Sequence, residues 1–333
     1  MRPRALSLIV CPACRGELAV SRSTEAEGDE LLEGVLRCAG CGAEYPVRGG
    51  VPRMGSEATA RPEGEATAQR FGMAWTYFDR LHEHYEAQFL GWIAPNRPED
   101  FAELTVLEGG CGKGRHSALV AKWGAKDVIA VDLGFAVDVA FKNTRHLENV
   151  HVVQADLLHL PVAEGSVDLA FSVGVLHHIE SPVEAFVELS KRVRSGGKVV
   201  AWVYGRENNG WIVHGVNPVR EAITSRLPFD AVARISVLPA GLLWLASRAV
   251  YKPLGKGPLR VIGDRLFYHQ YMKQLAEFPL WELHSIVADH LVPPIAHYVP
   301  HEEFVSWFDR AGLQDVTVTW HNQNSWRGTA RKP

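Results

Sequence analysis

The chain has 333 residues, of which 47% are hydrophobic and 22% charged, and a formal net charge of −3. This length exceeds what one ordinary core holds, so we expect a large α/β domain with a small additional module. The composition excludes a disordered or fibrous chain, and the slightly acidic balance provides no general electrostatic field that would attract nucleic acid.

Neither a secretory signal nor a transmembrane segment is predicted. Residues 1–10 are interrupted by charges and lack the apolar core of a signal peptide, which predicts a cytoplasmic protein. The longest uncharged apolar run lies between Arg234 and Arg248, contains Pro239 and falls short of the about 18 residues that cross a bilayer. Contact of this run with a membrane surface is kept as a hypothesis, as is a homo-oligomer.

Four of the five cysteines form two Cys-x-x-Cys pairs, namely Cys11 with Cys14 and Cys38 with Cys41. A turn of this spacing aims two thiolates at one point, and two such turns complete the tetrahedral sulfur site that zinc prefers. The segment 31–37 alternates around apolar positions and is expected to form the strand that returns the second pair. We therefore predict a structural Zn²⁺ ion bound by these four cysteines.

The residues after the second pair, from Ala43 to Met54, resemble the tail of a known zinc-ribbon family. This family includes the small ribbon that activates tRNA and rRNA methyltransferases and the ribbon fused to some ribosomal RNA guanine methyltransferases. Basic and acidic residues balance in the ribbon, which makes it a poor ligand for phosphates. We expect a structural or docking element.

From residue 104 onward, apolar strands alternate with amphipathic helices. Strands are predicted over 104–108, 127–133, 150–156, 167–175 and 198–204, and helices over 136–145 and 182–193. A helix over 302–312 and a strand over 315–320 are expected to close the sheet. This alternation predicts an α/β fold with a Rossmann-like, doubly wound parallel sheet and with ligands at the carboxyl ends of its strands.

The loop after the first of these strands has Glu108, Gly110, Gly112 and Gly114 at alternate positions. It departs from the dinucleotide-binding fingerprint, because Arg115 stands where that pattern has glycine or alanine, and it lacks the Ser or Thr of a P-loop. Its spacing resembles that of class I S-adenosylmethionine (SAM)-dependent methyltransferases.

Further residues match this family in chain order. Asp132 and Leu133 end the second strand, Asp156 and Leu157 follow the third, and Ser172 lies in the fourth. The resemblance implies that all five belong to the SAM site. Asp132 would bind the ribose hydroxyls, Asp156 would accept from the adenine amino group, and Leu157 would pack on the ring.

The resemblance extends from about residue 71 to the C-terminus and is similar to the methyltransferase type 11 group. The predicted organisation is a zinc ribbon over 1–55, a flexible linker over 56–69, a SAM-binding core over 70–205, an inserted helical cap over 206–300 and a completing helix and strands over 301–333. Aromatic residues over 71–78 recur at helical spacing and form either a packed helix or a flap over SAM.

The candidate general bases are His177 and His178, which follow the fourth strand and are placed to accept a proton from the methyl acceptor. We expect one of the pair to face the site and the other to pack. Tyr204 and Tyr298 are lesser candidates. Prolines are expected to break the cap into short helices, whose apolar residues either form the acceptor pocket or pack against one another or a second copy.

These features predict a SAM-dependent methyltransferase that acts on a small, partly apolar metabolite by in-line displacement at the sulfonium. A nucleic-acid partner is not expected from the acidic balance of the chain. Two alternatives are an RNA methyltransferase that uses the zinc ribbon for docking and a non-catalytic SAM-binding scaffold protein.

Overall fold

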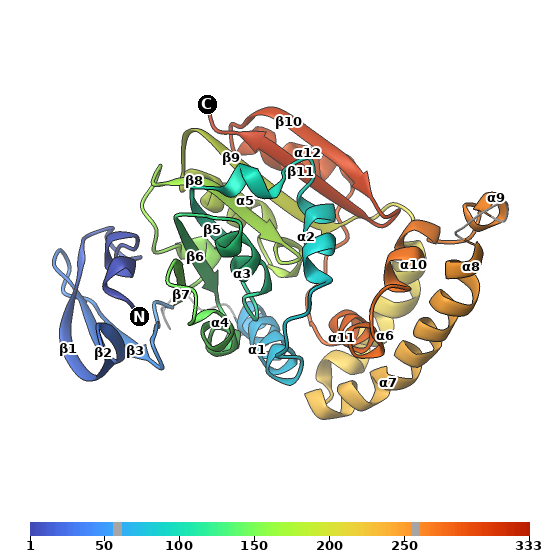
Figure 1. The fold of residues 1–333 in the computed structure, drawn as a ribbon, viewed down its shortest axis with the longest axis horizontal. Coiled ribbons are helices and arrows are strands. Elements are labelled where there is room, and N and C mark those ends of the chain that lie inside the picture. Colours follow the sequence, from blue (N-terminus) through green and yellow to red (C-terminus); the bar gives the residue numbers. More distant parts are fainter. Residues whose placement is uncertain (56–61, 255–259) are drawn as a thin grey trace.

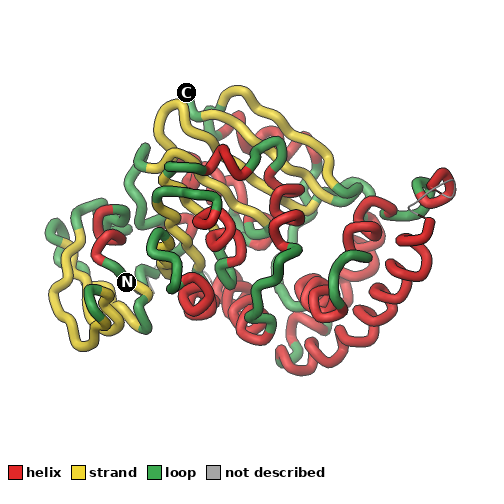
Figure 2. The backbone as a smooth tube through the Cα atoms, viewed as in Figure 1, coloured by secondary structure: helices red, strands yellow, loops and turns green. Residues whose placement is uncertain are grey.

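The computed structural model describes residues 1–55, 62–254 and 260–333. Figure 1 shows three parts along the long axis: the ribbon at one end, a central sheet with its helices, and a helical cap at the other end. Strands are confined to the ribbon and the central part, while the cap is built from helices (Figure 2). The predicted α/β architecture with a ribbon and a helical cap is therefore confirmed.

The ribbon is a four-stranded antiparallel sheet preceded by a short 3₁₀ helix, Pro3–Ser7. Its strands are β1 (Leu18–Glu27), β2 (Glu30–Cys38), β3 (Glu44–Arg48) and β4 (Val51–Pro52), in that order across the sheet. The strand expected over 31–37 lies within β2. Buried ribbon side chains such as Ile9 and Met54 belong to the same apolar cluster as the central sheet, so the ribbon packs on the core.

The central sheet has seven strands in the order β10-β11-β9-β8-β5-β6-β7. They are β5 (Thr105–Gly109), β6 (Asp127–Asp132), β7 (Val150–Gln154), β8 (Val167–Val173), β9 (Val193–Tyr204), β10 (Gln314–His321) and β11 (Ser325–Arg331). Strands β5 to β9 are parallel, as predicted, but β11 pairs antiparallel with both β9 and β10. The sheet is therefore mixed.

Strands were expected over 301–333, but the bounds of β11 were not predicted, and its packing explains why. Gly328 lies against Phe308, and a Cβ atom at this glycine would stand 2.4 Å from the phenyl ring. At this position the strand places only backbone atoms against the phenyl ring of Phe308, because glycine has no side chain. A short strand with glycine at a packed position lacks the alternating apolar pattern on which strand prediction depends.

Helices cover both faces of the central sheet. On one face lie α5 (Pro182–Lys191) and α12 (His301–Arg310), and on the other lie α2 (Tyr85–Ile93), α3 (Arg115–Lys122) and α4 (Ala136–Thr144). Successive residues of β5 alternate between these layers, with Leu107 in the first cluster and Val106 in the second. Such a three-layer arrangement buries a parallel sheet on both sides.

Helix α1 (Pro62–Tyr77) begins inside the segment 56–69 that was expected to be a flexible linker. Residues 56–61 lie outside the described residues. Arg70 on this helix donates hydrogen bonds to three backbone carbonyls of the cap, those of Thr224, Leu227 and Val292. Because a partly buried guanidinium needs several acceptors, these bonds fix α1 against the cap.

The cap contains α6 (Asn217–Ala222), α7 (Phe229–Ala246), α8 (Lys252–Leu254), α9 (Arg260–Gly263), α10 (His269–Leu275) and α11 (Leu280–Leu291), with π-helical turns at Ile212–Val216 and Ser247–Tyr251. The prediction that prolines divide it into short helices is wrong at Pro239, which lies inside the 18-residue helix α7. A proline removes one helical hydrogen bond, and packing of Val232 and Ala233 near Ala288 of α11 offsets that loss.

Candidate functional site

A cavity of ≈1010 Å³ lies at the carboxyl ends of the parallel strands. Its walls come from the glycine loop after β5, from the ends of β6 and β7, from α1 and from the cap. This is where parallel α/β sheets bind their ligands. The volume is at the upper end of the range for ligand pockets, which leaves room for a cofactor and part of an acceptor.

The glycine loop lets its backbone form one wall of the cavity. Gly110 has φ +84°, and a Cβ atom there would stand 2.2 Å from the side chain of Val175. Gly112 has φ +51°, and its Cβ would stand 3.0 Å from Nε1 of Trp75. Side chains at either position would be strained and would occupy the space that the cavity provides.

Glu108 and Ser172 lie behind the glycine loop and do not line the cavity. The Glu108 carboxylate accepts a hydrogen bond from the Ser117 hydroxyl and lies 3.1 Å from Nδ1 of His116, and burial raises its pKa to about 7. The Ser172 hydroxyl donates to the carbonyl of Gly109 at 2.8 Å. Ser172 therefore bonds to the loop and Glu108 to the start of α3, and the assignment of both residues to the cofactor site stays a prediction.

Asp132 and Asp156 stand at the ends of neighbouring strands and face the cavity. The Asp132 carboxylate accepts from the backbone N–H of Gly112 at 2.9 Å and of Gly134 at 2.8 Å, while burial raises its pKa. Asp156 accepts from the N–H of Leu158 at 2.9 Å. Backbone donors thus orient each carboxylate while leaving further lone pairs for a ligand.

This arrangement fits the adenosine part of SAM. Leu133 and Leu157 line the cavity beside the two carboxylates and provide apolar surface for an adenine ring. The ribose hydroxyls and the adenine amino group are the donors that the carboxylates require. Gly114, which the resemblance also assigned to the cofactor, is the left-handed residue at which α3 begins.

Replacing Asp132 by alanine is expected to weaken SAM binding by about 1.5–3 kcal/mol, since two hydrogen bonds to a charged group are lost. Asp156→Ala is expected to cost less, because it concerns a single amino group. Titration calorimetry with S-adenosylhomocysteine measures both, with circular dichroism as the check on folding. Binding by Asp132→Ala at wild-type strength would refute the assignment.

The aromatic residues over 71–78, expected to form either a packed helix or a flap over SAM, lie on helix α1 and directly after it. Phe71 and Trp75 line the cavity, and their rings stack with centroids 6.4 Å apart. Ala74 of α1 and Phe78, which directly follows the helix, are buried in an apolar cluster with Phe229 of the cap. The same side of α1 therefore contributes to the cavity wall and to the packing against the cap.

The wall of the cavity that the cap provides holds a carboxylate that the sequence analysis did not single out. Asp289 of α11 lines the cavity and accepts a hydrogen bond from the Tyr204 hydroxyl at 3.0 Å. Burial raises the pKa of Asp289 to about 6, against the opposing effect of the Tyr204 hydrogen bond. The ring of Tyr298 stacks on that of Tyr204 with centroids 5.5 Å apart. With this pKa, the Asp289 carboxylate can accept a proton near neutral pH.

The two candidate histidines differ in position. His178 lines the cavity, and its Nδ1 lies 2.7 Å from the carbonyl oxygen of Ile295, which fixes Nδ1 as the donor. Burial lowers its pKa to about 3, so it is a weak base. His177 is fully buried, is not part of the cavity wall, and burial lowers its pKa well below the usual value. Of the two histidines, His178 therefore faces the cavity and His177 packs behind its wall, and the choice of general base stays a prediction.

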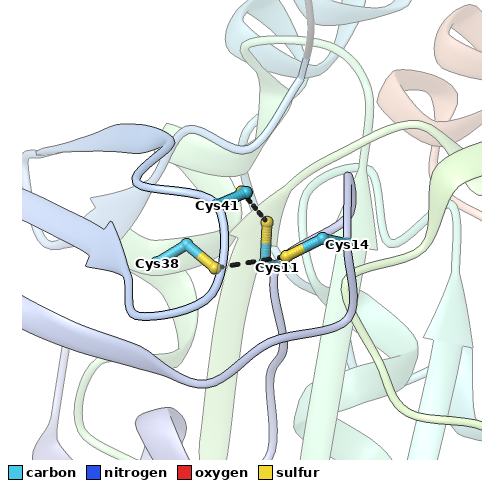
Figure 3. Close-up of side chains that lie close together, drawn as sticks. All are labelled: Cys11, Cys14, Cys38 and Cys41. Carbon is cyan, nitrogen blue, oxygen red and sulfur yellow. Dashed lines mark hydrogen bonds between the residues drawn. The ribbon is translucent and has the colours of Figure 1, made fainter.

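The four ribbon cysteines converge on one point (Figure 3). Their sulfur atoms all lie within 4.8 Å of one another, with Cys11 and Cys41 3.7 Å apart and Cys14 and Cys38 3.4 Å apart. Zn–S bonds of about 2.3 Å in a tetrahedron place sulfur atoms about 3.8 Å apart. The donor set and its spacing therefore fit a structural zinc ion.

Three arginines near the start of the ribbon are engaged by the core. Arg4 pairs with the carboxylate of Asp127 at 2.6 Å. Arg2 donates to the carbonyls of Arg145 and Leu147, and Arg15 donates to that of Leu160. These guanidinium groups hold the ribbon on the core, so they are not free to bind phosphates.

The end of the ribbon reaches the cofactor site. The N–H of Met54 donates to the carbonyl of Gln154 at 2.7 Å, and the Arg53 side chain donates to the Gln154 side chain at 3.2 Å. Gln154 ends β7, two residues before Asp156, and both Arg53 and Gln154 line the cavity. The ribbon thus supports the strand end that presents Asp156.

Comparison with known proteins identifies two families along the chain. Residues 107–201 match a family described as a methyltransferase domain, and residues 2–50 match the Trm112p-like protein family. The chain is 36% identical over 113 residues to the tRNA U34 carboxymethyltransferase of Methylococcus capsulatus, covering 33% of each protein. It is 29% identical over 144 residues to the same enzyme of Shewanella piezotolerans, covering 37% of this chain and 43% of that protein.

These matches span less than half of either curated relative. Among solved structures, one chain of a complex that contains the Haloferax volcanii Trm112 methyltransferase activator aligns with this chain. The alignment covers 80% of this chain and 97% of the matched chain, at 14% identity and a TM-score of 0.44. A SAM-dependent methyltransferase from Aquifex aeolicus aligns with 78% of this chain and 97% of that chain, at 15% identity and a TM-score of 0.43.

The curated relatives overturn two expectations drawn from the sequence. A small, partly apolar metabolite was expected as the acceptor and a nucleic-acid partner was not, yet both relatives are named for a modification of tRNA. The error came from the net charge of −3, which averages over the whole chain and says nothing about how charge is distributed on its surface.

The resemblances seen in the sequence, to the type 11 methyltransferases and to the activator ribbon, are confirmed by the two family matches. The cofactor cavity, the seven-stranded sheet and the four-cysteine cluster agree with them. The chain therefore joins a Trm112p-like zinc ribbon to a methyltransferase domain of the SAM-dependent class.

Proposed function

We propose that this chain transfers a methyl or substituted methyl group from a SAM-type donor to a base of RNA, with tRNA as the first substrate to test. The observation that carries the proposal is the cavity, in which the adenosine site continues into an aromatic end that holds Asp289. The names of the curated relatives direct the choice of RNA. The cytoplasm is the corresponding compartment, in agreement with four cysteines arranged for metal.

The aromatic end of the cavity suits a planar acceptor. The rings of Tyr204 and Tyr298 stack there, and Tyr268 and Tyr271 also line the cavity. Enzymes that modify a base take it out of its stack and hold it between aromatic side chains, which replace part of the lost stacking energy. An enclosed pocket of this kind accepts one base at a time.

Methyl transfer itself is an in-line displacement at the sulfonium, so positioning of donor and acceptor contributes most of the rate. The acceptor atom must also lose a proton. We assign this proton to the Asp289 carboxylate, which the Tyr204 hydroxyl holds in place. The ribbon supports the core in this proposal, because Arg2, Arg4 and Arg15 contact the core.

Purified protein is expected to transfer label from methyl-labelled SAM to tRNA, and mass spectrometry of the digested nucleosides identifies the modified base. Because the relatives are named as carboxymethyltransferases, a parallel reaction receives the S-carboxymethyl analogue of SAM as donor, and the added mass then distinguishes a methyl from a carboxymethyl group. Asp132→Ala is the matched control, since it lacks the cofactor contact and keeps the acceptor end. Cofactor binding without transfer from either donor to any RNA would contradict the proposal.

A further inference from the structure

Helix α7 carries a row of exposed apolar side chains on its outer face. Ile235, Leu238, Leu242 and Leu245 are all exposed, Leu238 at 71% and Leu242 at 61%. Their spacing of three or four residues places them on one side of the helix. The opposite side is buried against α11, so the row faces away from the protein.

The apolar surface continues beyond α7. Val261 and Ile262 of α9 are exposed at 66% and 56%, and Phe267 follows at 54%. Figure 1 shows α7, α8 and α9 along the edge of the molecule that lies farthest from the ribbon. We call these seven exposed residues of α7, α9 and the following turn the cap edge. Contiguous apolar surface of this kind marks an interaction site in soluble proteins.

The same segment is strongly basic. Between Phe229 and Ala276 there are seven lysines and arginines and two aspartates, in a chain whose net charge is −3. Lys252 and Lys273 pair with Glu277 and Asp264. Arg234 and Arg265, in contrast, are exposed and have no ion pair with any residue in the described part of the chain.

We propose that the cap edge lies on the surface of a membrane that contains anionic lipids, with α7 parallel to the membrane plane. An apolar face flanked by lysine and arginine is the pattern of helices that lie in the membrane interface. The leucines would enter the boundary of the acyl chains while Arg234 and Arg265 meet anionic headgroups. The apolar and the basic side chains of the cap edge would then each have a favourable partner in the bilayer.

Helix α7 is better suited to lie on a membrane than to cross it. The continuous helical path Phe229–Leu254 has 26 residues and is, within the described residues, the one helix long and apolar enough to span a bilayer. A span would separate its buried face, which includes Val232 and Ala233, from α11. Lying in the interface keeps that packing and uses only the outer face.

Other candidate partners of the cap edge would match either its apolar or its basic side chains, but not both. RNA would pair with the basic side chains and leave the leucines exposed to water. A second copy in a two-fold contact would cover the leucines but place the two basic segments against each other. An anionic bilayer is the partner that matches both.

Co-sedimentation with vesicles tests the proposal on the full-length protein. Binding is expected to vesicles of phosphatidylglycerol and phosphatidylcholine in equal parts, to be weaker with phosphatidylcholine alone and to fall with added salt. The double substitution L238Q/L242Q should reduce binding by about tenfold or more, since it removes the apolar contact from side chains that are mostly exposed in the protein. R234E/R265E should remove the preference for the anionic lipid.

Matched controls come from the opposite end of the molecule, where Val20→Gln and Arg22→Glu replace exposed residues of β1 and should leave vesicle binding unchanged. The proposal is overturned if wild-type protein does not bind the anionic vesicles. It is also overturned if L238Q/L242Q converts a stable dimer to a monomer, which assigns the surface to a second copy. Loss of tRNA binding in R234E/R265E without loss of vesicle binding would assign the basic residues to RNA.

Discussion

Asp289→Asn is expected to slow methyl transfer by about 10²–10⁴-fold, the usual contribution of a general base. Asparagine has the shape of aspartate and still accepts the hydrogen bond from Tyr204, but it cannot take a proton from the acceptor. The residue lies at the acceptor end of the cavity, so cofactor affinity should change little. Single-turnover rates and calorimetry with S-adenosylhomocysteine measure these two quantities separately.

The pH dependence of the rate distinguishes Asp289 from His178. Burial raises the pKa of Asp289 to about 6, so the wild-type rate should rise with pH through about 6 as the carboxyl loses its proton. Asp289→Asn should lack this rise. His178→Asn should retain it, because burial lowers the pKa of His178 to about 3. A rise near pH 6 that persists in Asp289→Asn would assign the proton to another group.

Tyr204→Phe tests how Asp289 is positioned. The Tyr204 hydroxyl donates to the carboxylate and thereby lowers the pKa of Asp289. Removal of this hydroxyl should shift the rise in rate to higher pH and reduce the maximal rate less than Asp289→Asn does. An unshifted profile would show that Tyr204 does not act through Asp289.

The cofactor end of the cavity could be predicted from the sequence because its chemistry is local. Gly110 and Gly112 are required by backbone geometry within one loop, and Asp132 follows a strand that the apolar pattern reveals. Asp289 carries no such signal, since its partner Tyr204 is 85 positions away in the chain. Their contact depends on how the inserted cap folds over the sheet, which no short motif encodes.

The ribbon shows a different limit of sequence reasoning. Counting charges correctly gave a balanced module, but a count does not show which face a side chain occupies. Arg2, Arg4 and Arg15 all contact the core, which supports the structural one of the two roles expected for the ribbon. In the cap, the same averaging hid a basic segment within an acidic chain.

Loss of the zinc ion is expected to unfold the ribbon and to weaken cofactor binding. Structural zinc contributes about 10–16 kcal/mol in small metal modules, more than the core of such a module provides by itself. Cys38→Ser removes one of four ligands whose sulfur atoms lie within 4.8 Å of one another. The ribbon also supports Gln154 through Met54, so disorder in it should reach Asp156 at the edge of the cofactor site.

We therefore expect Cys38→Ser protein to lose its zinc in mass-spectrometric metal analysis and to bind S-adenosylhomocysteine about tenfold more weakly. Arg22→Ala, an exposed change on β1 far from the metal ligands, is the matched control and should preserve both. Arg53→Ala separates the two effects, because it removes a contact with Gln154 while all four cysteines remain. It should retain zinc and lose part of the cofactor affinity. Reduced, tag-free wild-type protein without zinc would refute the metal site, and undiminished cofactor binding by zinc-free protein would show that the ribbon does not support the cavity.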